Sequence, residues 1–133
     1  MALWNKKKMT DMIVSFLKGN NASYEIDGNI ISFEVHFDKK DFTLYPYIKM
    51  TELKSILSFG VNLRALNSSE KLEKKADKIN LFNLSSPYYN AYIGNDNVIY
   101  LEYNTVATTD SVVQILINVI DSLFKLQDEI DSL

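Results

Sequence analysis

The residues in this sequence whose types could support nucleophilic catalysis are Ser32, Glu34 and His36, at alternate positions of a predicted strand. A serine–histidine–carboxylate set requires each side chain to hydrogen-bond to the next. Alternate residues of a strand stand about 6.5–7 Å apart, too far for those bonds. The chain has one histidine, so a nucleophile elsewhere in the sequence would have no histidine to act as its base. We therefore interpret the three as a solvated strand face and expect no enzyme activity. A small-molecule-binding or enzymatic domain using the sheet face around His36 is the alternative.

Metal and cofactor sites are not predicted. The chain contains no cysteine, which excludes disulfides, zinc–thiolate sites and thiol nucleophiles. A second histidine is missing and the carboxylates show no ligand spacing. Asp96 stands between two asparagines, but the alternating acidic ligands of a calcium loop are missing. The glycines form no loop that would cradle a phosphate. We expect neither a metal ion nor a cofactor.

Charge and hydropathy restrict the partners and the location. The net charge is −3 and Arg64 is the single arginine, whereas nucleic-acid-binding domains normally carry a basic footprint. The apolar stretch Met9–Leu17 is too polar for a signal peptide and too short to span a membrane. We therefore expect a cytoplasmic protein that binds neither nucleic acid nor a membrane.

The apolar pattern predicts the elements that position these residues. Helices are expected over 3–18, 70–83 and 110–131, and strands over 23–26, 30–37, 42–50, 55–63, 88–93 and 98–103. Residues 51–58 also fit a helix, so 51–63 is either strand or helix, with strand favoured. Pro46 inside a strand indicates an edge position or a bulge. The order α-β-β-β-(β)-α-β-β-α predicts an α+β fold, an antiparallel sheet with helices packed on one face. The length and the lack of a linker predict a single domain, 1–133.

The final helix carries two adjacent apolar rows. The first row is Val112, Leu116, Val119, Leu123, Leu126, Ile130 and Leu133, and the second is Val113, Ile117, Ile120 and Phe124. A surface helix needs one stripe about 100° wide. Leaving half of these side chains in water would forfeit on the order of 10 kcal/mol, comparable with the whole stability of a small domain. Either the sheet and first helix cover both rows, or a partner subunit covers one, and we favour a homodimer.

Tyrosines mark a second candidate surface. Tyr45 and Tyr47 alternate with aliphatic residues, and strand parity places Tyr88, Tyr92 and Tyr100 opposite the aliphatic side of the last hairpin. Tyrosine is enriched at recognition surfaces, although strand propensity alone also explains it. The predicted protein-binding residues are Tyr45, Tyr47, Tyr92, Tyr100, Val112, Leu116, Val119, Leu123, Leu126 and Ile130.

The second half of the chain, over about residues 66–130, resembles the bacterial YbjN family. The likeness rests on Asn80-Leu81-Phe82-Asn83, Ala91-Tyr92-Ile93, the turn Asn95-Asp96-Asn97 and the segment Val98–Glu102 before a long amphipathic helix. That family is similar in fold to the small chaperones of type III secretion, which are dimers that hold unfolded effector segments. The resemblance implies a role in sensory regulation and no catalytic residues. We therefore expect a non-enzymatic protein-binding module, chaperone-like or regulatory.

Overall fold

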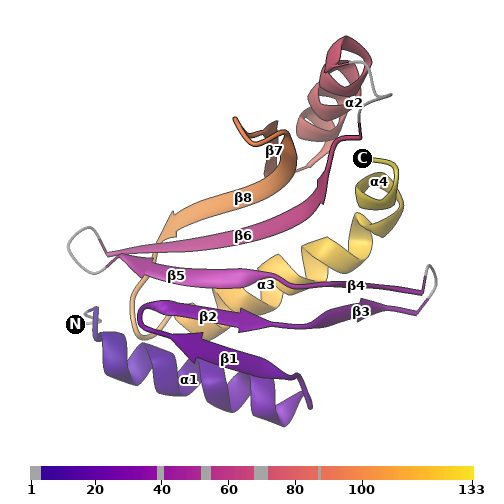
Figure 1. Ribbon diagram of the computed structural model, residues 1–133. Coiled ribbons are helices and arrows are strands. Elements are labelled where there is room, and N and C mark those ends of the chain that lie inside the picture. Colours follow the sequence, from indigo (N-terminus) through magenta and orange to yellow (C-terminus); the bar gives the residue numbers. More distant parts are fainter. Residues whose placement is uncertain (1–3, 39–40, 52–54, 68–71, 87) are drawn as a thin grey trace.

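An antiparallel sheet of six strands, in the order β1-β2-β5-β6-β8-β7, forms the centre of the molecule (Figure 1). The computed structural model describes residues 4–38, 41–51, 55–67, 72–86 and 88–133. The strands of this sheet are β1 (Tyr24–Asp27), β2 (Ile30–Phe33), β5 (Tyr47–Thr51), β6 (Ile56–Ala65), β7 (Asn90–Ile93) and β8 (Val98–Val106). A separate two-stranded ladder, β3 (Val35–Phe37) with β4 (Phe42–Leu44), continues β2 and β5.

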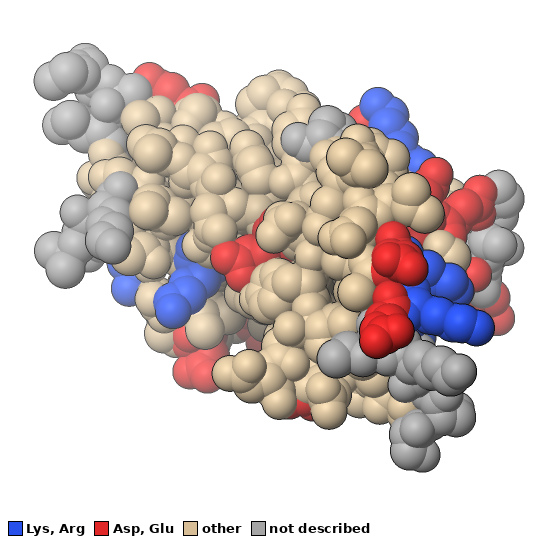
Figure 2. Space-filling model, turned by 90° about the horizontal axis from the view of Figure 1, so that it is seen from above, with Lys and Arg blue, Asp and Glu red and all other residues tan. Residues whose placement is uncertain are grey.

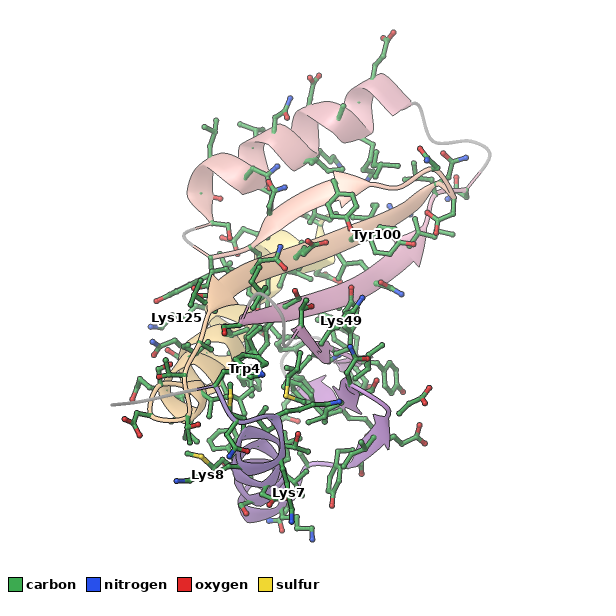
Figure 3. The ribbon with its side chains drawn as sticks, turned by 90° about the vertical axis from the view of Figure 1, so that its left-hand side faces the viewer. Trp4, Lys7, Lys8, Lys49, Tyr100 and Lys125 are labelled. Atoms are coloured by element: carbon green, nitrogen blue, oxygen red, sulfur yellow. The ribbon has the colours of Figure 1, made fainter. Side chains whose placement is uncertain are left out.

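The helices leave one face of the sheet open. The helices are α1 (Lys6–Gly19), α2 (Leu72–Ser85), α3 (Val112–Lys125) and the short α4 (Gln127–Asp131). In Figures 1 and 3, α1 and α3 lie on one side of the sheet, and α2 lies beside its β7 edge. The predicted α+β fold, with its antiparallel sheet and this order of elements, is confirmed.

The first helix begins and ends differently from the prediction. Asn5 caps it, because its Oδ1 accepts the Lys8 backbone N–H at 3.0 Å. Gly19 is the last helical residue, one position beyond the predicted end, and Asn21 takes the positive φ of 55°. Asparagine tolerates this conformation better than most residues do.

Two predicted strands are each interrupted. The chain leaves strand geometry at Glu34, which separates β2 from β3, and at Tyr45–Pro46, which separates β4 from β5. Proline has no N–H for a ladder, but its carbonyl oxygen accepts the Phe33 backbone N–H at 3.0 Å. In place of the predicted bulge, Pro46 lies in a break between β4 and β5. Of the two strands that flank Pro46, β5 lies between β2 and β6, whereas β4 pairs with β3 in the two-stranded ladder.

The later elements follow the predicted order and type, except that the final helix is divided in two. The strand favoured within 51–63 is confirmed as β6, although residues 52–54 lie outside those described. In α2, Lys75 is buried and Ala76 is exposed. The final helix is divided at Leu126 into α3 and α4. Lys75 Nζ and Arg64 Nε donate to the backbone oxygen of Leu133, at 3.4 and 3.0 Å, and this holds the end of the chain against α2 and β6.

Candidate functional site

The first apolar row of the final helical segment lies in the core. Val112, Leu116, Val119, Leu123 and Ile130 are buried, and Leu126 is partly buried against them. The inner side of the sheet and the buried face of α1 supply the residues that cover the row. In this structure the row is therefore largely closed to a partner, and protein binding by these six residues stays a prediction.

The second row faces the solvent beside α1. Ile117 and Phe124 are 40% and 42% exposed, and Val113 and Ile120 are partly buried. Val113 lines one hollow with Met12 and Phe16, and Ile120 and Phe124 line a second with Phe16. We call this surface the helix groove, and its residues are Met12, Phe16, Val113, Ile117, Ile120 and Phe124. An apolar row at half exposure is the kind of surface that a protein partner covers.

A group of tyrosines lies on the open face of the sheet. Cross-strand pairing places Tyr47 opposite Gly60 and Gly60 opposite Glu102, while Tyr92 pairs with Tyr100 on the outer strands. Paired residues share a face, so all of these lie on the side away from α1 and α3. Figure 3 shows Tyr100 and Lys49 on this side, with Lys8 and Lys125 on the helical side. We call Tyr47, Tyr92, Tyr100 and Glu102 the tyrosine face.

Hydrogen bonds hold the tyrosine face in place. Tyr92 and Tyr100 stack with ring centroids 5.3 Å apart and an interplanar angle of 17°. The Tyr92 hydroxyl donates to Glu102 Oε2 at 2.9 Å, and the Tyr100 hydroxyl donates to Asp96. Asn104 Nδ2 donates to Glu102 Oε1 at 2.7 Å. The two outer rings and the carboxylate therefore have defined positions before any partner binds.

Tyr47 reaches this group because Gly60 has no side chain. A β-carbon at Gly60 would clash with the ring carbons and the hydroxyl of Tyr47, so the ring lies directly over the backbone of β6. Glycine inside a strand commonly marks such a close approach. Burial raises the pKa of the Tyr47 hydroxyl, and the negative charge of Glu102 raises it further. The charge of Glu102 on β8 thus affects the phenol of Tyr47 on β5, across the intervening strand β6.

We expect Tyr92 to titrate far above an ordinary tyrosine. Burial raises its pKa to about 12, helped by its hydrogen bond to Glu102 and by the charge of that carboxylate. Glu102→Gln removes the charge, so the pKa of Tyr92 is expected to fall toward 10 while burial keeps it above that value. NMR of carbon-13-labelled tyrosine rings measures both values.

The raised pKa of Tyr92 makes the folding stability fall at high pH. The folded pKa of Tyr92 lies above the unfolded value of 10.0, so its contribution to stability is complete below pH 10 and is lost as the pH rises toward 12. A wild-type pKa near 10, or one that Glu102→Gln leaves unchanged, would contradict this arrangement.

Two tyrosines assigned to this surface from the sequence, Tyr45 and Tyr88, lie apart from the tyrosine face. Tyr45 is 63% exposed in the connection from β4 to β5 and lines a hollow with Tyr24 and Glu25. Tyr88 packs edge-on against Tyr103, with centroids 5.6 Å apart, and lines a hollow with residues of α3. The expectation that Tyr88 faces the open side is wrong. Strand β7 begins only at Asn90, so strand parity does not extend to residue 88.

The strand face around His36 does not form the triad that its residue types suggested. The break at Glu34 places Ser32 and His36 on different strands. The imidazole Nδ1 lies 3.0 Å from the Thr43 hydroxyl, and Nε2 lies 3.5 and 3.6 Å from Asp38 and Asp41. Both aspartate side chains are almost fully exposed, so water weakens any attraction between them and the imidazole.

A cavity of about 410 Å³ does adjoin His36 at the end of the helix groove. Phe33, Val35 and Phe124 form apolar parts of its wall, and Glu34 also lines it. Thr43, the hydroxyl partner of the imidazole, is not among the residues that line it. The cavity can therefore hold an apolar group, but the hydroxyl–imidazole pair does not present its oxygen there.

The predicted binding residues did not include Glu102 and Asn104 of the open sheet face, or the second row of α3. Glu102 and Asn104 alternate with Tyr100 along β8, so strand parity could have placed them beside it. The second row of α3 was recognised, but the first row was chosen for binding. Nothing in the local pattern separates the two, because both rows have helical spacing.

Wide areas of the surface formed by the described residues carry no charged side chains. Seen from above α2 and β7, most of the coloured surface carries neither acidic nor basic side chains (Figure 2). No group of three or more histidine, aspartate or glutamate side chains suited to a metal ion occurs among the residues described. Across the same residues, no helix is long and apolar enough to cross a membrane.

Most of the chain matches a known protein family. Residues 10–131 match the model of the YbjN family, which is described as "Putative bacterial sensory transduction regulator". No curated protein matches the chain. The matched region runs from α1 to the end of α4 and so includes both the helix groove and the tyrosine face.

Proposed function

Because the chain belongs to the YbjN family, we propose that it is a non-enzymatic regulator that acts by binding protein and works as a homodimer. The family description supports a regulatory role, and protein binding is the mechanism that the two surfaces suit best. The resemblance to type III secretion chaperones supports the same mode of action, because those proteins are dimers that hold unfolded segments. The proposed role uses the helix groove for the second copy and the open sheet face for another protein.

The half-exposed second row of α3 is the observation that carries this proposal. Ile117 and Phe124 remain 40% and 42% exposed although the rest of the segment is well packed. Covering the exposed part of such side chains stabilises an assembly by about 1 kcal/mol each. In a twofold interface each residue counts twice, once on each subunit. The groove residues on α1 and α3 would then supply several kilocalories per mole to self-association.

The rim of the helix groove also suits a second copy. Lys8 and Asp11 of α1 line the hollow that contains Met12 and Val113. A twofold axis across the groove would bring the lysine of one copy near the aspartate of the other. Charged residues of opposite sign around an apolar centre are typical of protein interfaces.

We expect light scattering coupled to size-exclusion chromatography to show a dimer at micromolar concentration. The double variant Ile117→Ser, Phe124→Ser is expected to be monomeric, with a dissociation constant raised on the order of 100-fold. Leu84→Ser is the matched control, because Leu84 is an equally apolar but 85% exposed residue on α2, outside the groove. Circular dichroism of each variant checks that the fold is kept.

Two results would count against the homodimer. One is a wild-type protein that stays monomeric at the highest soluble concentration. The other is a groove variant that remains dimeric while Leu84→Ser becomes monomeric, which would move the interface to α2.

Ligand binding in the 410 Å³ cavity is the second candidate function. Its apolar wall with Glu34 and His36 favours a small molecule that has an apolar part and a polar end. The light-scattering experiment separates the two candidates. Self-association requires a mass that depends on concentration, whereas ligand binding does not require one.

A further inference from the structure

The open face of the sheet combines aromatic rings with negative charge. The charged residues on this side of the described strands are Glu25, Asp27 and Glu102, against the single base Lys49. Asp96, in the turn between β7 and β8, adds a further carboxylate at Tyr100. A partner that docks on this face is therefore expected to carry positive charge.

The carboxylate of Glu102 is placed to receive such a charge. It already accepts one hydrogen bond on each oxygen, from Tyr92 at 2.9 Å and from Asn104 at 2.7 Å. A carboxylate has about four acceptor sites, so it can take two further N–H donors. The fixed orientation of Glu102 suits a planar donor that approaches both oxygens together.

The rings around Glu102 supply the second part of the contact. Tyr47 lies over Gly60 on one side of the carboxylate, and the Tyr92–Tyr100 stack lies in the adjacent row. Aromatic faces attract cations, and a guanidinium group can also stack flat on a ring. Because hydrogen bonds and the stack already fix Tyr92, Tyr100 and Glu102, these three side chains lose little conformational entropy when a partner binds.

We propose that the tyrosine face binds an arginine side chain of a partner protein, with the guanidinium on Glu102 and stacked against the tyrosine rings. Arginine is preferred to lysine, because an ammonium group neither stacks nor bonds both carboxylate oxygens in one plane. An open sheet face is a suitable platform for a polypeptide that presents one such side chain. This inference rests on the proposed protein-binding function and names the chemistry of the partner at the open face.

A short peptide tests the proposal in the full-length protein. The probe is an acetylated and amidated tripeptide with arginine between two valines, followed by nitrogen-15 NMR of the backbone amides. We expect saturable shifts centred on Tyr92, Tyr100 and Glu102. The matching lysine peptide is expected to bind at least threefold more weakly. The citrulline peptide, which has the same shape without the charge, is expected to bind at least tenfold more weakly.

Two substitutions with the same change of charge locate the contact. Glu102→Gln is expected to raise the dissociation constant of the arginine peptide at least tenfold. Glu25→Gln, on β1 in the same cross-strand row of this face but at the opposite edge, is expected to change it less than twofold. An equal effect of the two substitutions would show general attraction to an acidic surface and would overturn the proposal. Equal binding of the citrulline peptide to the wild-type protein would also overturn it, even if Glu102→Gln failed to fold.

Light scattering on the same samples keeps this test separate from that of the homodimer. If a monomeric protein binds the peptide, the arginine site is supported and the proposed homodimer is contradicted. A dimer that does not bind the peptide would remove the arginine site and leave the homodimer intact.

Discussion

Leu116→Ala is expected to lower the free energy of unfolding by about 2–5 kcal/mol, whereas Ile117→Ala, one residue later, is expected to lower it by less than about 1 kcal/mol. The two positions are neighbours on α3 and lose similar aliphatic volume. Leu116 is fully buried and Ile117 is 40% exposed. Truncation at Leu116 leaves a cavity between α3 and its neighbours in the core, while truncation at Ile117 opens only the groove surface. Urea denaturation followed by circular dichroism measures both changes.

Protein concentration separates the core effect from the proposed self-association. The loss at Leu116 is expected to be the same at low and high concentration. The loss at Ile117 is expected to grow with concentration, because the wild type gains stability from dimer formation and the variant does not. Equal losses at both positions would mean that the second row is as well packed as the first, and the helix groove would then have no role in binding.

Asn83→Ala is expected to lower the free energy of unfolding by about 2–3 kcal/mol. The Asn83 side chain lies along the outer edge of β7 and makes two hydrogen bonds to the backbone of Ala91. Its Nδ2 donates to the Ala91 carbonyl oxygen at 3.0 Å, and its Oδ1 accepts the Ala91 N–H at 2.6 Å. The amide thus occupies the place of a neighbouring strand. Its removal leaves two buried backbone groups of Ala91 without these bonds.

Asn80→Ala is the matched control for Asn83→Ala. Asn80 is an exposed residue one turn earlier on α2, so this change is expected to stay within about 0.5 kcal/mol. Asn83→Asp keeps the acceptor and loses the donor, so its effect is expected to lie between the other two. Hydrogen exchange of the Ala91 amide should accelerate in Asn83→Ala and not in Asn80→Ala. Unchanged exchange and stability would show that β7 needs no partner on that edge.

The order and type of most elements follow from local patterns. Alternation of apolar and polar residues identified β6 and the last hairpin, and helical spacing identified α1, α2 and α3. Parity along a strand also placed Tyr92 and Tyr100 on one face. Each of these depends on residues only a few positions apart, which is the range over which backbone geometry repeats.

Strand parity was unreliable where the backbone was irregular. The break at Glu34 separated Ser32 from His36, and Tyr88 precedes the strand in which it was counted. The alternation that places side chains on one face or the other holds only while the chain keeps strand geometry. Candidate sites built on parity therefore need the strand ends as well as the residue spacing.

By itself, the sequence determined an α+β chain whose last helix has two apolar rows and whose tyrosines alternate along strands. The tertiary structure decided which row is buried, since that depends on the side chains that pack against it from the sheet and from elements as distant in the sequence as α1. It also decided that Gly60 leaves room for Tyr47 to approach Glu102, and that Asn83 closes the edge of β7. These contacts join residues on different elements, and only the packing of those elements brings them together.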